Sequence, residues 1–111
     1  MANRPKYGNR KITADGEIFD SKKEYRRFCE LSLLERAGEI TDLQRQVAYE
    51  LLPSQRVGGK VAELPVKYIA DFVYKENGQE VVEDTKGFRT ADYKLKRKMM
   101  LYFHGIQIRE V

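Results

Sequence analysis

The chain has 111 residues, of which 41% are hydrophobic and 34% charged, with a formal net charge of +4. This length suits one domain with a modest core, residues 1–111, and the positive charge makes an anionic partner plausible. One cysteine and one histidine exclude an internal disulfide framework and a histidine-rich zinc site. No apolar stretch approaches the ~20 residues of a membrane span. Residues 1–6 lack the apolar block of a signal peptide, so a cytoplasmic location is expected.

The first segment of the chain is polar and basic. It is interpreted either as a frayed terminus or as a flexible basic arm, residues 1–10, that contacts phosphate. Residues 11–19 then predict a small β-hairpin that turns at Asp15–Gly16. Because a lone hairpin is marginal in water, this one is expected to pack on the rest of the domain.

A helix is predicted from Ser21 to about Ala37. Ser21 is a favourable N-cap, Glu24 stands at the capping-box spacing from it, and Gly38 suits the position after the last turn. Glu24 falls on the apolar side, and two interpretations stay open: its carboxylate caps the amide of Ser21, or it points toward the sheet and joins an acidic site. Cys29, at the edge of the same side, is expected to pack and not to act as a nucleophile.

Two strands are predicted next. Residues 40–52 alternate in polarity, with an irregularity expected near Gln44–Gln46, and Pro53 ends the strand. Residues 54–63 are expected to form a loop with a basic tip, which either flexes over a ligand or is a plain surface turn. Residues 64–74 form the following strand.

A third strand lies just beyond. The pair Asn77–Gly78 is the strongest short-range hairpin signal, and residues 80–87 are again rich in β-branched side chains. Asp71 and Asp84 are therefore expected on neighbouring antiparallel strands. Because side chains alternate along a strand, Asp84 and Lys86 are expected to point to the same side.

A second helix is predicted from Ala91 to about His104, capped by Thr90 and ended by Gly105. Its buried stripe is expected to consist of Leu95, Met99, Tyr102 and Phe103. The remaining surface is basic and, with the residue that precedes the cap, supplies the expected nucleic-acid contacts: Arg89, Lys94, Lys96, Arg97 and Lys98. This basic face is either simply solvated or follows a phosphate backbone.

Residues 106–111 alternate cleanly and predict a closing strand. Since it follows a helix, it can join parallel to an earlier strand by a right-handed crossover. The order is then hairpin, α, β, β, β, α, β. This order predicts an α/β (α+β) fold with a mixed central sheet flanked by two helices.

The charged residues of the two central strands allow two interpretations. In the first, Asp71 and Lys86 form a structural ion pair on an exposed face and Asp84 is hydrated. In the second, both faces are covered because the flanking residues are apolar, and two covered carboxylates repel each other unless a cation lies between them. Oxygen ligands without histidine or cysteine favour Mg²⁺ or Mn²⁺, beside which Lys86 would orient or deprotonate a water.

Asp71, followed thirteen positions later by Asp84-Thr85-Lys86, resembles the Asp…(Asp/Glu)-x-Lys signature of the PD-(D/E)XK nuclease superfamily. The predicted α-β-β-β-α-β order is similar to the restriction-endonuclease-like core of that superfamily. Nearly the whole chain also resembles a family of small phage and prophage proteins of uncharacterised function. The segments that carry this second resemblance are residues 7–8, 19–24, 33–38, 70–72, 83–87 and 108–111.

The superfamily resemblance implies a role for each matching residue. Asp71 and Asp84 would ligate the metal ion, Mg²⁺ or Mn²⁺, with help from the Thr85 carbonyl. Lys86 would position the attacking water. Glu24 matches an acid that many members add from the first helix, which favours a place in the metal shell.

Two departures from the superfamily pattern narrow the implied function. Ala70 stands in place of the nominal proline, and Tyr93 and Lys94 lie where RecB-type exonucleases carry a Gln-x-x-x-Tyr motif. The resemblance therefore implies a phage-type endonuclease, resolvase-like or nicking, that hydrolyses DNA in the host cytoplasm. A catalytically silent DNA-binding accessory protein, a structural or partner-binding phage protein, and an RNA substrate stay open. Because cutting a duplex would need two active sites, a homodimer is expected.

Overall fold

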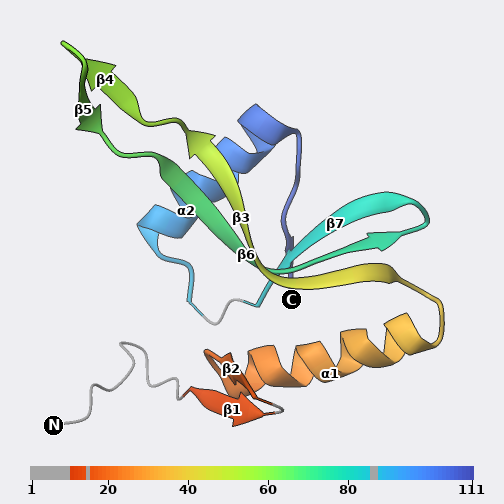
Figure 1. The fold of residues 1–111 in the computed structure, drawn as a ribbon. Helices are drawn as coiled ribbons and strands as arrows, with labels where there is room; N and C mark the ends of the chain where they lie inside the picture. Colours follow the sequence, from red (N-terminus) through yellow and green to blue (C-terminus); the bar gives the residue numbers. More distant parts are fainter. Residues whose placement is uncertain (1–10, 15, 86–87) are drawn as a thin grey trace, which may run out of the picture.

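A computed structural model describes residues 11–14, 16–85 and 88–111 (Figure 1). The elements in chain order are β1 (Ile12–Ala14), β2 (Glu17–Phe19), α1 (Lys22–Arg36), β3 (Thr41–Leu52), β4 (Gln55–Val57), β5 (Lys60–Glu63), β6 (Val66–Glu76), β7 (Gln79–Asp84), α2 (Ala91–Met99), the π-helical turn η1 (Met100–His104) and β8 (Arg109–Glu110). The predicted α+β class, with a mixed sheet and two helices, is confirmed. The basic arm proposed for residues 1–10 lies outside the described residues, and so does Lys86.

The main sheet has four strands in the order β3–β6–β7–β8. β3, β6 and β7 pair antiparallel, whereas β8 pairs parallel to β7, as expected for a strand that follows a helix. The β6–β7 hairpin turns through Asn77 and Gly78, whose φ angles are 53° and 75°, as the Asn-Gly pair predicts. Within the described residues, no helix is long and apolar enough to cross a membrane.

The first helix begins and ends where its caps predict. The Ser21 hydroxyl accepts a hydrogen bond from the Glu24 N–H at 3.1 Å, and Gly38, with a φ of 78°, follows the C-cap residue. Leu31 of α1 packs in a cluster with Ile40, Phe72 and Tyr74, which we call the α1 cluster. The hairpin predicted over residues 11–19 is confirmed by the antiparallel pairing of β1 with β2, and Asp15 of its predicted turn lies outside the described residues.

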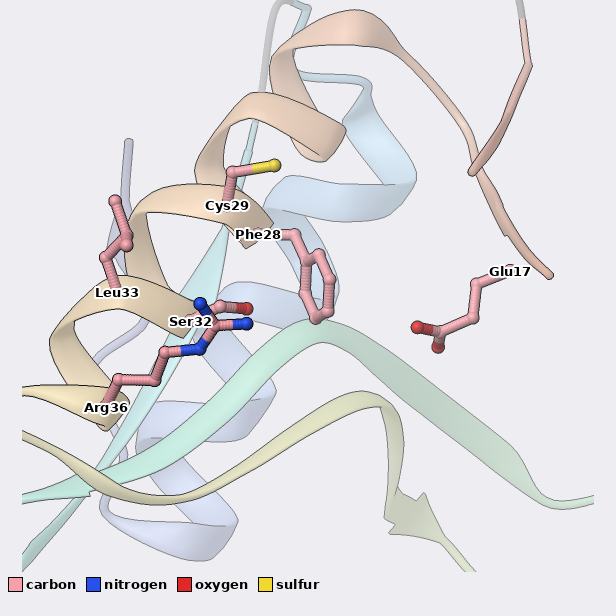
Figure 2. A pocket seen from close by; sticks show the side chains of 6 residues that line it. All are labelled: Glu17, Phe28, Cys29, Ser32, Leu33 and Arg36. Carbon is pink, nitrogen blue, oxygen red and sulfur yellow. The ribbon is translucent and has the colours of Figure 1, made fainter. Parts of the chain in front are cut away.

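Cys29 is exposed, so its predicted packing role is wrong. It lines a shallow hollow together with Phe28 and Leu33, and Figure 2 shows its sulfur pointing out from the helix. The buried side of α1 is centred on Glu24 and Leu31, which are seven residues apart. Cys29 stands away from that line because each residue turns about 100° around a helix axis.

The loop expected over residues 54–63 is instead a third hairpin, β4–β5, and that prediction is wrong. Its two-residue turn is Gly58–Gly59, with φ angles of 60° and 80°, and a Gly-Gly pair is itself a hairpin signal. Every residue from Pro53 to Leu64 is exposed. In Figure 1 this hairpin continues β3 and β6 well beyond the two helices.

The second helix buries a different stripe from the predicted one. Leu95, Tyr102 and Phe103 are exposed, and Met99 is half-buried. Tyr93 and Met100 are buried instead and pack with Tyr68, Ala70, Val73, Val82, Leu51 and Ile108 in the α2 cluster. The helix is α-helical only to Met99 and then continues as the π-helical η1. A π turn holds more residues than an α turn, so the 3.6-residue period used for the prediction does not extend through it.

One face of the β3–β6 pair contributes to both clusters. Tyr68 and Ala70 of β6 pack in the α2 cluster, whereas Phe72 and Tyr74, which share their parity along the strand, pack in the α1 cluster. The change occurs at Asp71, opposite Gln46 of β3, where the regular pairing is interrupted and Gln46 has a φ of 53°. The predicted irregularity near Gln44–Gln46 is confirmed. It lies at a point of strong twist, beside the candidate site.

Candidate functional site

Four polar residues align across the main sheet. Phe72 pairs with Glu83 and with Arg45, so continuing each register by one residue places Asp71 opposite Asp84 on one side and Gln46 on the other. Asp84 pairs in turn with Glu110 of β8. We call Gln46, Asp71, Asp84 and Glu110 the polar row. The expectation that Asp71 and Asp84 occupy neighbouring antiparallel strands is therefore confirmed, and their register places them on the same face of the sheet.

Asp71 is held by the residue that follows β7. Its Oδ2 accepts hydrogen bonds from both the N–H and the hydroxyl of Thr85, each at 2.9 Å. Because two donors of one residue fix a single carboxylate oxygen, the orientation of Asp71 depends on the path of the chain at Thr85. Asp71 itself is half-buried. Sequence reasoning assigned Thr85 a role through its carbonyl and missed its role as a donor.

Asp84 is fully buried and lies against two tyrosines of the α2 cluster. The Tyr68 hydroxyl donates to Asp84 Oδ2 at 2.7 Å. Burial and then the negative charge of Asp84 raise the pKa of Tyr68 well above its ordinary value, so this phenol remains a hydrogen-bond donor. The Tyr93 ring lies 6.4 Å from that of Tyr68, between centroids. Asp84 is thus a carboxylate placed inside the domain and oriented by an aromatic donor.

Glu24 reaches the same region from the first turn of α1. Its exposure is 2%, and its Oε1 accepts hydrogen bonds from the Gln46 side-chain amide at 3.0 Å and from Arg45 at 3.3 Å. Its Oε2 accepts from the N–H of Asp20, one residue before the amide that the capping interpretation predicted. Burial, followed by the negative charge of Asp71, raises the pKa of the Glu24 carboxyl. Glu24 therefore caps the start of the helix through the amide of Asp20 and not that of Ser21, and it reaches the sheet through Gln46, whereas its place in an acidic metal site stays a prediction.

Glu83, next to Asp84 in the chain, was not singled out from the sequence. It is fully buried on the opposite face and accepts two hydrogen bonds from Arg27 of α1, at 2.5 and 2.9 Å. The Tyr74 hydroxyl donates to it at 2.5 Å. Glu83 ties α1 to β7, directly beside the site. The sequence did offer a signal for this pair. Glu83 is an acid within an apolar strand, and an acid that is buried there needs a cationic partner on a neighbouring element.

The basic residues expected to bind nucleic acid differ in their surroundings. Arg89 and Arg97 both donate to Glu110 of the polar row, at 3.0 and 3.2 Å, and Lys96 lies 3.5 Å from Asp92. Hydrogen bonds, first from Arg89 and then from Tyr93, lower the pKa of Glu110 to about 2. Lys94 and Lys98 are exposed on α2. Part of the predicted basic face is thus used to neutralise Glu110 and to secure α2 on β8.

A shallow hollow adjoins the polar row on the α2 side. It is lined by Lys67, Tyr68, Ile69, Thr90, Asp92, Tyr93 and Lys96. Tyr68, which bonds Asp84, forms part of its wall, so the hollow lies one side chain away from the buried acid. Its lining carries two lysines and one aspartate, Asp92, which pairs with Lys96, and the Thr90 cap places the start of α2 there.

The donor set around the polar row has the chemistry of a hard-cation site. Asp71, Asp84 and Glu24 supply only oxygen, which suits Mg²⁺ or Mn²⁺. Among the described residues, however, no three acidic, histidine or cysteine side chains form a ready-made metal-binding group. Each of the three acids already accepts hydrogen bonds from protein donors. Lys86, predicted to act with them, lies outside the described residues.

The fold and the site define a small α+β protein in which a mixed sheet carries a transverse row of polar residues beside a buried helix-borne acid. The chain belongs to the family described as "Protein of unknown function (DUF1064)", whose model matches residues 4–110. No curated protein and no solved structure matches the chain.

Proposed function

We propose that this protein is a metal-dependent endonuclease of the PD-(D/E)XK type, with a restriction-endonuclease-like core, that hydrolyses phosphodiester bonds of DNA. The observation that carries the proposal is a pair of aspartates that face each other across the sheet, with a buried glutamate of α1 bonded to the same row of polar residues. Asp71 and Asp84 oppose each other across β6 and β7, and Glu24 of α1 lies near enough to Asp71 for that charge to raise its pKa. Grouped carboxylates of this kind favour the binding of a divalent cation.

Asp71, Asp84 and the main-chain carbonyl of Thr85 would hold the cation, with Glu24 as an additional acid. A cation bound there supplies Lewis acidity, which activates a water and neutralises charge that develops on the phosphate. Thr85 and Tyr68 keep the two aspartates oriented through their hydrogen bonds. Lys86 is proposed to orient the attacking water, as the superfamily resemblance implies.

The substrate would approach from the α2 side. The hollow beside Tyr68 carries Lys67 and Lys96 on its rim, and Lys94 and Lys98 are exposed on the neighbouring helix. Cations spaced along a surface bind the phosphate backbone without reading the bases. This arrangement supports a nuclease that recognises backbone shape more than base sequence.

A second candidate function has a specific observation in its favour. Every acid of the site accepts at least one hydrogen bond from a protein donor, so protein groups alone can hold the acids in place. A DNA-binding accessory protein that does not cleave would have this arrangement. The two functions make the same prediction for DNA binding and opposite predictions for cleavage.

The test is a cleavage panel on duplex, nicked, flap and four-way-junction DNA with Mg²⁺, Mn²⁺ or EDTA. We expect cutting with either metal and none with EDTA. Asp84→Asn and Lys86→Ala are each expected to reduce the rate at least about 100-fold, the lower range for loss of a catalytic acid or base.

The matched control is Glu63→Gln, which changes an exposed acid of β5 outside both the polar row and the hollow and should cut like the wild type. DNA binding without metal-dependent cutting would identify the accessory protein instead. Cutting that survives Asp84→Asn would refute the proposed site.

A further inference from the structure

Gln46 has a backbone conformation that its residue type does not explain. Within the described part of the chain, three residues other than glycine have φ angles in the left-handed region: Asp42 at 55°, Gln46 at 53° and Asn77 at 53°. Asparagine and aspartate adopt this region comparatively easily, and Asn77 does so in a hairpin turn, where it is favoured. Gln46 lies inside β3 and has neither justification. A strained backbone of this kind persists only where the surrounding structure enforces it.

The strain coincides with the candidate site. Gln46 is the member of the polar row opposite Asp71, at the break in the β3–β6 pairing. Its side-chain Nε2 donates to Glu24 Oε1 at 3.0 Å. Gln46 is itself exposed, whereas Glu24 is buried, so this amide reaches inward from the surface to the acid.

A requirement for twist alone does not account for a glutamine. Glycine would adopt the same φ without strain and would preserve both the break in pairing and the twist. What glycine would lack is the carboxamide. We therefore attribute the presence of glutamine at this position to its carboxamide, because glycine could supply the backbone conformation but not the side chain.

We propose that Gln46 is a positioning residue of the acidic site: its left-handed backbone, at the break opposite Asp71, turns the carboxamide onto Glu24 and fixes the orientation of that carboxylate. This inference rests on the proposed function and adds to it a residue outside the superfamily signature. Arg45 also donates to Glu24 Oε1, at 3.3 Å, and forms an ion pair with Glu17 at the surface. Without the Gln46 amide, the Glu24 carboxylate keeps its hydrogen bonds to Arg45 and to the Asp20 N–H and loses its hydrogen bond to the polar row.

The decisive variant is Gln46→Gly, which removes the carboxamide and relieves the strain together. We expect a melting temperature close to that of the wild type, because relief of the strain offsets the hydrogen bond lost to Glu24. The Mn²⁺ affinity, measured by calorimetry, should be lower by about 10- to 100-fold, as for other residues that orient metal ligands. Asn77→Gly is the matched control, because it relieves the same φ at a distance from the site. It should leave Mn²⁺ affinity unchanged.

A Gln46→Gly protein that binds Mn²⁺ like the wild type would overturn the positioning role. If its melting temperature is also lower, Gln46 is a purely structural residue.

A metal-free measurement separates this inference from the proposed function. The side-chain amide signal of Gln46 in a nitrogen-15 spectrum should shift in Glu24→Ala, since that variant removes its acceptor. If the wild type binds no Mn²⁺, the nuclease proposal fails, and the spectrum still decides whether Gln46 holds Glu24. An unshifted amide signal would overturn the positioning role.

Discussion

Glu83 and Asp84 are consecutive residues with the same burial and opposite surroundings. Both side chains are fully buried, but Glu83 faces α1 and meets the guanidinium of Arg27, whereas Asp84 faces α2 and accepts from the phenol of Tyr68. A guanidinium fixed by two hydrogen bonds neutralises a carboxylate permanently. A phenol orients a carboxylate and leaves its charge in place. The comparison teaches that the α1 side of β7 is an anchor, whereas on the α2 side a neutral donor orients the buried carboxylate, as the proposed cation site requires.

The largest effect is expected from breaking the anchor. Arg27→Met leaves the Glu83 carboxylate buried without its guanidinium, and loss of one partner of a buried pair typically costs about 3–5 kcal/mol. The hydrogen bond to Glu83 also raises the pKa of Arg27, which agrees with a strong pair. Urea unfolding measures the change in free energy.

The control for this variant is the double substitution Arg27→Met with Glu83→Gln. It removes the stranded charge and still offers an acceptor to the Tyr74 hydroxyl, so most of the lost stability should return. A loss of unfolding free energy below about 1 kcal/mol in Arg27→Met is typical of a surface ion pair. Such a result would mean that the α1 side of β7 is not an anchor.

A smaller effect is expected on the other side of the strand. Tyr68→Phe keeps the ring in the α2 cluster but removes the hydrogen bond to Asp84, and a buried acceptor that loses a donor typically costs about 1–3 kcal/mol. Thermal unfolding of the variant and the wild type measures this loss of stability. Tyr102→Phe, at 82% exposure, is the matched control and should stay within about 0.5 kcal/mol of the wild type. A Tyr68→Phe protein as stable as the control would show that the phenol does not orient Asp84.

The smallest effect is a pH dependence at the end of the polar row. The pKa of Glu110 is lowered to about 2 from 4.5, so its contribution to stability is present above pH 4.5 and is lost as the pH falls toward 2. Because Glu110 and its arginine partners are partly exposed, we expect no more than about 1 kcal/mol. Glu24 has the opposite sign: its pKa is raised, so its ionisation lowers stability as the pH rises above 4.5.

Urea unfolding of the wild type and of Glu110→Gln across this acidic range isolates the first contribution. The difference in unfolding free energy between the two proteins should shrink as the pH falls. A constant difference would mean that Glu110 is not held ionised by Arg89 and Arg97.

Much of the fold was predictable because its signals are local. Ser21 and Thr90 as caps, Gly38 and Gly105 as terminators, and the Asn-Gly turn each depend on a few neighbouring residues. The placement of Asp71 opposite Asp84 followed from that turn. The side of α2 that is buried was not predictable in this way, because it depends on η1 and on Glu110, which draws Arg97 inward.

The acids of the candidate site could be predicted from the sequence, but the donors that orient these acids could not. The spacing of Asp71 and Asp84 fixed their neighbourhood, and the capping box drew attention to Glu24. The donors that orient them, Thr85, Tyr68 and Gln46, come together only through strand register and twist. No local sequence pattern predicts that a glutamine inside a strand has a backbone conformation in the left-handed region.

The position of β3 has a consequence for how the protein behaves at high concentration. β3 is the outermost strand of its sheet, and a long outer strand offers a row of backbone donors and acceptors to any other chain. The left-handed residues Asp42 and Gln46 interrupt its flatness, and Lys75 of the neighbouring strand lies 3.6 Å from Asp42, which keeps charge at that rim. A second molecule therefore meets a distorted outer strand at β3, which disfavours extension of the sheet and fibril-like association through that edge.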